Sequence, residues 1–141
     1  MDEYDLAFQI AEQAHKGQVD TSGKPYIEHP LRVSAKCTDA KCKCIALLHD
    51  VLEDSGSTSE DLRGAGISDE VVDAVVALTH LKSEPRDHYY ERIKKNPLAL
   101  VVKLADIEDN TNPERLALLD EGTRRRLEKK YAEAKSKLME L

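Results

Sequence analysis

The sequence is poor in large aromatic side chains and in long apolar segments. It has no Trp and one Phe among 141 residues, and no run approaches the roughly 18 consecutive apolar residues of a membrane-spanning helix. Its first residues, MDEYDLAFQ, are acidic, whereas a secretory signal peptide begins with basic residues. These absences argue against a membrane protein and against export, and we expect a cytoplasmic protein.

Positive charge is also scarce. The chain has 21 Lys and Arg against 27 Asp and Glu, which gives a net charge of −6. Nucleic-acid backbones are held mainly by Lys and Arg, so we expect no nucleic-acid partner. A small anionic substrate stays compatible with this charge, because a bound metal ion can dominate the local field.

The cysteines are too few for a structural zinc site of the usual kind. The segment CTDAKCKC holds all three, Cys37, Cys42 and Cys44, and no second cysteine pair exists elsewhere in the chain. Structural zinc usually takes four ligands from two such pairs. We therefore interpret the three residues as free thiols in a reducing compartment.

What the sequence does have is helical periodicity. Leu6, Ile10 and Ala14 share one stripe, and no segment alternates with the two-residue period of a strand. Without linkers, repeats or low-complexity tracts, the chain is predicted to be one all-α bundle domain spanning residues 1–141. After the first helix, helices are predicted from about Pro30 to Lys36, from about Asp39 to Glu53, and over 69–80, 86–95, 98–111 and about 122–140.

Several helix starts carry capping residues. Thr58 followed by Asp61 predicts a capping box, and Ser68 is expected to cap the helix that follows it. Asn96, which precedes Pro97, and Asp120 are the expected caps of the last two long helices.

The segment ALLHDVLEDSGST, residues 46–58, places charged groups at the end of an apolar helix. His49 and Asp50 are adjacent and could offer a nitrogen and an oxygen to one divalent ion, with Glu53 and Asp54 one helical turn further on. The alternative is a helix end whose acids are simply solvated.

Two further segments favour the metal site. His29 lies at a loop-to-helix junction in YIEHP, and Asp106 follows the apolar run LVVKLA. A buried carboxylate without a partner would cost several kcal/mol, so a cation or donor is expected beside it. Two His and two Asp form a mixed nitrogen and oxygen site that suits manganese, iron, cobalt or zinc.

The order of these residues resembles the H…HD…D signature of HD-domain metal-dependent phosphohydrolases. AHKGQ, SGKPYIEHPL, ALLHDVLEDS and VVKLADIEDN further resemble the ppGpp hydrolase domain of RelA/SpoT proteins, and particularly its small stand-alone versions, over about residues 7–110. This resemblance implies an all-helical HD domain, a Mn²⁺ ion, and removal of pyrophosphate from the 3′ position of guanosine tetra- or pentaphosphate.

The resemblance also implies roles for individual residues. Glu53 and Asp54 would be the acid/base and water-orienting pair, and Asn110 would lie beside the sugar-phosphate. Lys24 and Tyr26, in the SGKPY motif, are further candidates for substrate binding, although core packing is the alternative for Tyr26. The implied metal ligands are His29, His49, Asp50 and Asp106.

The chain departs from the family pattern where a polyanion is expected. Asp20 and Thr21 replace two basic residues, His80 replaces the Lys that usually follows Thr, and Glu108-Asp109 replaces Leu-His. Each change lowers the positive charge or adds negative charge. The residues that could compensate are Lys16, Lys24, Arg32, Lys82 and Arg86.

Three functions follow from these observations. The first is a hydrolase of ppGpp or pppGpp that yields GDP or GTP and pyrophosphate. The second is a metal-dependent phosphohydrolase acting on another nucleotide or a phosphorylated cofactor. The third is a nucleotide-binding module without activity. The sequence leaves the oligomeric state open.

Overall fold

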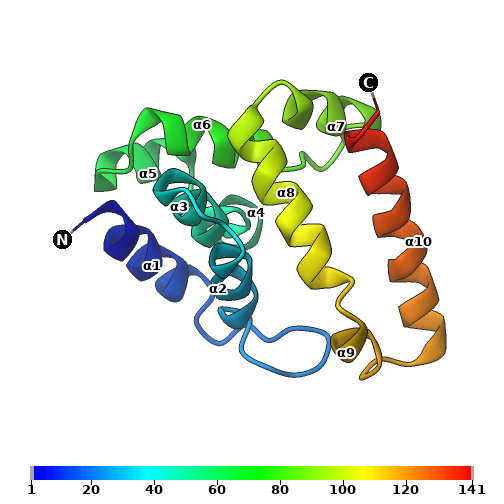
Figure 1. Cartoon of the computed structure of the whole chain (residues 1–141). Helices are drawn as coiled ribbons and strands as arrows, with labels where there is room; N and C mark the ends of the chain where they lie inside the picture. Colours follow the sequence, from blue (N-terminus) through cyan, green and yellow to red (C-terminus); the bar gives the residue numbers. More distant parts are fainter. Residues whose placement is uncertain (1, 141) are drawn as a thin grey trace.

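The computed structural model describes residues 2–140, and every named element within them is a helix (Figure 1), which confirms the predicted all-α class. One isolated antiparallel bridge, between Val19 and Pro25, closes the loop after the first helix. The helices are α1 (Glu3–Ala14), α2 (Glu28–Ala35), α3 (Ala40–Leu48), α4 (Val51–Ser55), α5 (Ser59–Ala65), α6 (Asp69–Leu78), α7 (Arg86–Lys94), α8 (Pro97–Asn110), α9 (Pro113–Leu116) and α10 (Glu121–Leu138).

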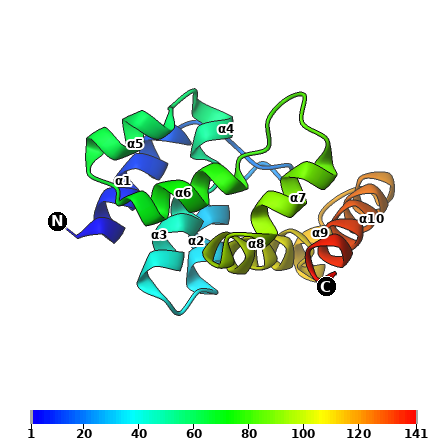
Figure 2. The same ribbon diagram turned by 90° about the horizontal axis from the view of Figure 1, so that it is seen from above.

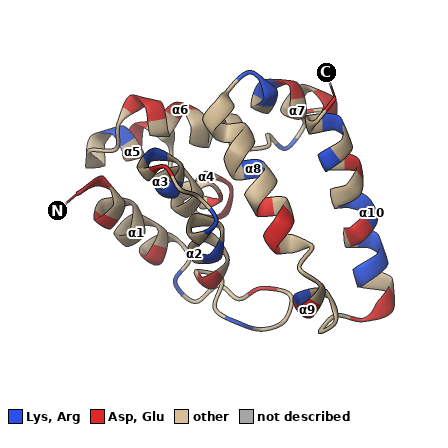
Figure 3. Cartoon of the chain, in the orientation of Figure 1, with Lys and Arg blue, Asp and Glu red and all other residues tan. Residues whose placement is uncertain are grey.

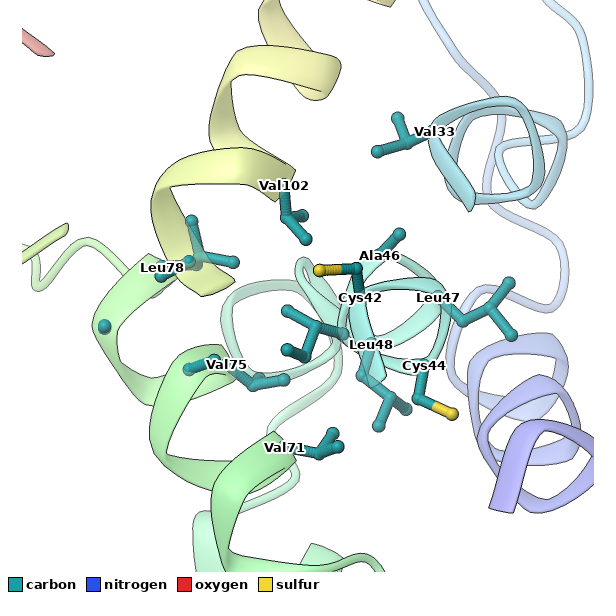
Figure 4. Close-up of a cluster of buried hydrophobic side chains, with 14 of the residues drawn as sticks. Val33, Cys42, Cys44, Ala46, Leu47, Leu48, Val71, Val75, Leu78 and Val102 are labelled. Carbon is teal, nitrogen blue, oxygen red and sulfur yellow. The ribbon is translucent and has the colours of Figure 1, made fainter. Parts of the chain in front are cut away.

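Helix α3 is the centre of the fold. Its residues from Cys44 to Leu48 are all buried, and it packs against α1, α2, α6 and α8. Figure 4 shows α3 side chains between Val33 of α2, Val71 and Val75 of α6, and Val102 of α8. A helix that is apolar on all sides must be buried on all sides. Because α3 is buried up to its last residue, His49, which follows Leu48, also lies in the interior of the molecule.

The helix predicted from Asp39 to Glu53 is two helices. Helix α3 ends at Leu48 and α4 begins at Val51, so His49 and Asp50 form the junction. At this junction the His49 Nδ1–H donates to the carbonyl of Ala46, three residues back, at 2.5 Å. Asp50 has φ −105° and ψ −1°, which depart from the values of a regular α-helix. The apolar pattern runs through the break, which is why periodicity did not reveal it.

The capping predictions are largely confirmed. Thr58 and Asp61 form a capping box, Asn96 Oδ1 accepts from the Ala99 N–H, and Asp120 Oδ1 accepts from the Thr123 N–H. The side-chain cap expected of Ser68 is wrong. Ser68 occupies the N-cap position of α6, but its hydroxyl instead accepts from Lys41 Nζ at 3.1 Å.

The remaining helices surround this core asymmetrically. Helices α1 and α5 lie on one side of the bundle and α10 lies on the other, beyond α8 and α7 (Figures 1 and 2). Cys37, Cys42 and Cys44 are buried free thiols. Within residues 2–140, none of the helices combines the length and the apolar character needed to cross a bilayer.

Candidate functional site

Three buried side chains from three parts of the fold converge on one point. His29 comes from the first turn of α2, His49 from the α3–α4 junction and Asp106 from α8. Asp106 Oδ1 lies 2.8 Å from His29 Nε2 and 3.2 Å from His49 Nε2. Each of the three can offer a ligand atom that lies within 4.8 Å of the others, so they form a group able to hold a metal ion.

Asp50 adds a fourth donor to this group. Its Oδ2 lies 3.1 Å from His49 Nε2 and 3.9 Å from His29 Nε2. The hydroxyl of Tyr26 donates to the same oxygen at 2.5 Å. The break between α3 and α4 therefore lets two adjacent residues point into one site.

The spacing of these donors fits a metal ion. Two bonds of about 2.1 Å that meet at a right angle place their donor atoms about 3 Å apart. The distances of 2.8, 3.1 and 3.2 Å from Asp106 and Asp50 to the two imidazoles match that value. The mixture of imidazole and carboxylate suits a borderline divalent cation.

The electrostatics of the group also favour a cation. Burial alone would lower the pKa of His49, but the carboxylates of Asp50 and Asp106 raise it well above its ordinary value. Burial works against charge on Asp106 as well, yet Lys103 and the two imidazoles hold its pKa well below the usual range. Asp50, buried beside His49, has its pKa lowered to about 2. The negative charge of the two ionised carboxylates favours protons on the two imidazoles. The same negative charge would attract a divalent cation bound between these four side chains.

Glu53 and Asp54 lie on α4 but face different surroundings. Glu53 lines the same cleft as Asp50, and its Oε1 accepts from the His80 N–H at 2.6 Å. Partial burial of the carboxylate, with Asp50 and Asp54 nearby, raises the pKa of Glu53. Asp54 accepts from Gln18 Nε2 at 3.3 Å, on the side of the loop that follows α1. The structure thus places Glu53 in the cleft with the ligand candidates, whereas Asp54 is not among the described residues that line it.

The three residues expected to bind substrate are placed differently. Asn110 lines the cleft and donates from Nδ2 to Asp106 Oδ1 at 3.2 Å. Tyr26 also lines the cleft and is half-buried, with its hydroxyl on Asp50. Lys24 is exposed on the loop after α1, outside the set of described residues that line the cleft.

Asp20 and Thr21 lie at the rim of the cleft. Asp20 Oδ1 accepts from Ser22 N and Oγ, both at 2.8 Å, and from Lys24 N at 3.0 Å. Its Oδ2 lies 3.6 Å from Arg115 Nη2. The negative charge of Asp20 is therefore partly neutralised by donors of its own loop and by Arg115 of α9.

The cleft has a volume of about 360 Å³, and its walls include cations that sequence reasoning missed. Lys103 of α8 lies 3.1 Å from Asp106 Oδ2, and Lys130 and Tyr131 of α10 line the opposite wall. Lys103 stands three residues before Asp106, a helical spacing that could have indicated it. Nothing in the mixed charge pattern of α10, visible in Figure 3, distinguishes Lys130 from its exposed neighbours.

A larger groove of about 1000 Å³ lies between α8 and α10. It is lined mainly by apolar side chains, including Val101, Leu104 and Met139, and it holds none of the four metal-ligand candidates. The chemistry-bearing residues therefore belong to the smaller cleft.

Known proteins are similar to this chain in sequence and in fold. A guanosine-3′,5′-bis(diphosphate) 3′-pyrophosphohydrolase of Haemophilus influenzae is 38% identical over 88% of this chain and 20% of its own length. The bifunctional (p)ppGpp synthase/hydrolase SpoT of Escherichia coli K12 is 34% identical over 94% of this chain and 20% of its own length. This chain thus spans about a fifth of the length of these curated relatives.

A solved structure extends the comparison to the whole fold. It is described as a metazoan ortholog of SpoT that hydrolyses ppGpp, and it superposes with a TM-score of 0.80 and 26% identity over 99% of this chain and 86% of its own. A family model described as an HD domain matches residues 7–109. The resemblance seen in four short motifs is confirmed, and the chain belongs to the HD-domain family.

Proposed function

We propose that this chain is a Mn²⁺-dependent hydrolase that uses water to remove the 3′-pyrophosphate of ppGpp or pppGpp, giving GDP or GTP and pyrophosphate. The observation that carries the proposal is the convergence of His29, His49 and Asp106, with Asp50 beside them. Three of these four residues, His29, Asp50 and Asp106, line the cleft. The names of the relatives support this substrate, and the metazoan protein of similar size is described as hydrolysing ppGpp. We further propose that residues 1–141 act as a single cytoplasmic domain without a nucleic-acid partner.

The metal would be held by His29, His49, Asp50 and Asp106. A divalent cation there would lower the pKa of bound water towards neutrality and neutralise phosphate charge. The hydroxyl of Tyr26 holds Asp50, and Asn110 and Lys103 hold the two oxygens of Asp106. These contacts fix the carboxylates in place before a ligand arrives.

Proton transfer is assigned to Glu53. One of its oxygens is held by the His80 N–H, which leaves the other free to accept the proton of the attacking water. The raised pKa of Glu53 makes it a stronger base than an exposed Glu. Asp54 is assigned to orienting the loop and the water through Gln18, which also contacts His15 Nδ1 at 2.9 Å.

Cations of the cleft wall are assigned to the phosphates. Lys103, Arg115 and Lys130 line the cleft and would supply the charge that Asp20 and Thr21 do not. Asn110 and the ring of Tyr26 are proposed to contact the sugar and the base. Lys24 is exposed and lies outside the described residues that line the cleft, so it would have to contact a part of the substrate that extends out of the cleft.

The direct test is pyrophosphate release from ppGpp in the presence of Mn²⁺. The wild-type chain should release pyrophosphate, and His49→Ala or Asp106→Ala should abolish the reaction. Asp73→Ala is a matched control, because Asp73 is an exposed carboxylate on α6 that pairs with Arg63. Full activity of Asp106→Ala would contradict the ligand set.

A second substrate class is favoured by one observation. Asp20 and Thr21 line the cleft where the family has basic residues, so another nucleotide or a phosphorylated cofactor could fit better. A panel of 2′-, 3′- and 5′-phosphorylated nucleotides, assayed with Mn²⁺, separates the two proposals. Preference for a compound without a 3′-phosphate would favour the second, and tight binding without turnover would indicate the non-catalytic module.

A further inference from the structure

Asp109 is a buried carboxylate that lies outside the group of metal-ligand candidates. Its side chain is 3% exposed. It lies on α8, three residues after Asp106. The RelA/SpoT hydrolase domains that this chain resembles have His at this position. A buried carboxylate of this kind needs strong partners, because its desolvation costs several kcal/mol.

Three donors surround Asp109. Its Oδ2 lies 2.6 Å from His29 Nδ1 and 2.9 Å from Arg115 Nη1, and its Oδ1 accepts from Arg32 Nε at 2.8 Å. The two guanidiniums come from α2 and α9, so they hold the carboxylate from both sides. The two arginines thus balance the negative charge of Asp109 without the imidazole. The contact between Asp109 and His29 therefore has a purpose other than neutralising Asp109.

The contact with His29 fixes which ring nitrogen faces the metal site. With Nδ1–H donated to Asp109, the remaining nitrogen, Nε2, points at Asp106 Oδ1 at 2.8 Å. His49 has the equivalent contact only with the neutral carbonyl of Ala46. A carboxylate partner holds an imidazole more firmly and makes it a better donor to a metal than a carbonyl partner does.

We propose that Asp109 is a positioning residue that orients His29 as an Nε2 ligand and strengthens its bond to the metal ion. Arg32 and Arg115 in turn hold Asp109. This inference rests on the metal site of the proposed function, and it assigns a role to a residue for which neither the sequence motifs nor the ligand geometry gave one.

The test is the affinity of the full chain for Mn²⁺ alone, measured by titration calorimetry after removal of metal with a chelator. Asp109→Asn keeps the shape of the side chain but removes its charge, and we expect the dissociation constant for Mn²⁺ to rise about 10- to 100-fold. Arg32→Gln removes a partner of Asp109 and leaves the imidazole contact, so it should weaken binding much less.

Two further readouts separate positioning from a general loss of structure. Glu3→Gln breaks an ion pair with Lys41, far from the cleft, and should keep wild-type affinity for Mn²⁺. With ppGpp as substrate, raising the Mn²⁺ concentration should return the kcat of Asp109→Asn towards the wild-type value without changing the KM for the nucleotide. If Asp109→Asn does not fold, Asp109→Glu keeps the charge but shifts the oxygens by one methylene, and it should also bind Mn²⁺ at least about 10-fold more weakly.

The outcomes distinguish the two proposals. A wild-type chain that binds no Mn²⁺ would overturn the metal site and the proposed function together. A wild-type chain that binds Mn²⁺ while Asp109→Asn binds it equally well, or while Arg32→Gln loses as much affinity, would overturn only the role of Asp109.

Discussion

At the scale of single residues, the two acids of α4 illustrate how neighbouring carboxylates come to have different surroundings. Glu53 faces the cleft with one oxygen held by the His80 N–H, whereas Asp54 faces the loop and binds Gln18. The replacement of the family Lys by His80 does not disturb this arrangement, since the contact uses the backbone of residue 80. We therefore propose that Glu53 transfers the proton and that Asp54 has a supporting role.

Substituting Glu53 tests this assignment. Glu53→Gln keeps a side-chain oxygen for the His80 N–H but cannot accept a proton, so kcat should fall by about 10²- to 10⁴-fold. Affinity for Mn²⁺ should stay unchanged, because Glu53 belongs neither to the group formed by His29, His49 and Asp106 nor to its added donor, Asp50. Asp54→Asn is the matched control and should lose less activity. Wild-type turnover by Glu53→Gln would contradict the assignment.

The pH dependence of the rate follows from the same residue. Because the pKa of Glu53 is raised, its basic form is lost as the pH falls through a value above the ordinary Glu pKa. At saturating Mn²⁺, the kcat of the wild type should therefore decline on the acidic side of its pH profile. Glu53→Gln should lack this decline. The measurement is kcat against pH for both proteins. An identical profile for the two would assign the limb to another group.

The residues of the site differ in how far sequence could predict them. His49, Asp50 and Asp106 could be selected as ligand candidates because each follows an apolar segment, whereas His29 was selected from its loop-to-helix position and from the HD-domain resemblance. Asp109, Lys130 and Tyr131 could not, because their positions depend on how α8, α9 and α10 pack. In the sequence, Asp109 belongs to a Glu-Asp pair that lowers positive charge or adds negative charge relative to the family pattern, whereas in the structure its charge is matched by two arginines.

At the scale of elements, the break between α3 and α4 was invisible to periodicity. Val51 and Leu52 continue the apolar pattern of α3, and Val51 is fully buried. The break instead coincides with a local contact, in which the imidazole of His49 donates to the carbonyl of Ala46. Similarly, Ser68 lost its expected capping contact, since Lys41 donates to its hydroxyl and Glu3 accepts its backbone N–H. The start of α6 is therefore held by α1 and α3 instead of by its own cap.

The contacts of Glu3 at this junction of α1, α3 and α6 should contribute to the stability of the folded chain. Glu3 Oε1 lies 2.8 Å from Lys41 Nζ, and Glu3 Oε2 accepts from the Ser68 N–H at 2.7 Å. Glu3→Gln should lower the free energy of unfolding by about 1 kcal/mol at neutral pH. Although partial burial opposes ionisation, these contacts lower the pKa of Glu3 in the folded state. The contribution of Glu3 to the free energy of unfolding is therefore complete above the pKa that Glu3 has in the unfolded chain. It is lost as the pH falls through the pKa that Glu3 has in the folded chain.

Urea unfolding of wild type and Glu3→Gln at neutral and acidic pH measures both effects. The difference between the two proteins should shrink as the pH is lowered. Arg63→Gln is a suitable control, since Arg63 pairs with exposed acids at the surface and its removal should change the free energy of unfolding little. A difference that stays constant down to the lowest pH at which the protein folds would contradict the ionic role of Glu3.

At the scale of the whole molecule, the cleft is where helices from distant parts of the chain meet. The four ligand candidates come from α2, the α3–α4 junction and α8, and the wall facing them comes from α10. The buried α3 connects these parts, since α1, α2, α6 and α8 all pack on it. The ligands are therefore assembled only in the folded chain, and an ion that binds them must bind the folded state in preference to the unfolded one.

Metal binding should accordingly stabilise the protein. At a free Mn²⁺ concentration of 100 times the dissociation constant, the stabilisation is about 2.7 kcal/mol, which corresponds to a rise in Tm of roughly 10 °C for a domain of this size. A chelator should reverse the shift. Asp106→Ala should show little shift, while Asp73→Ala, which leaves the cleft intact, should show the full one. Since the unfolded chain holds the four donors apart, an equal shift in Asp106→Ala would mean that the ion stabilises the fold from somewhere other than this cleft.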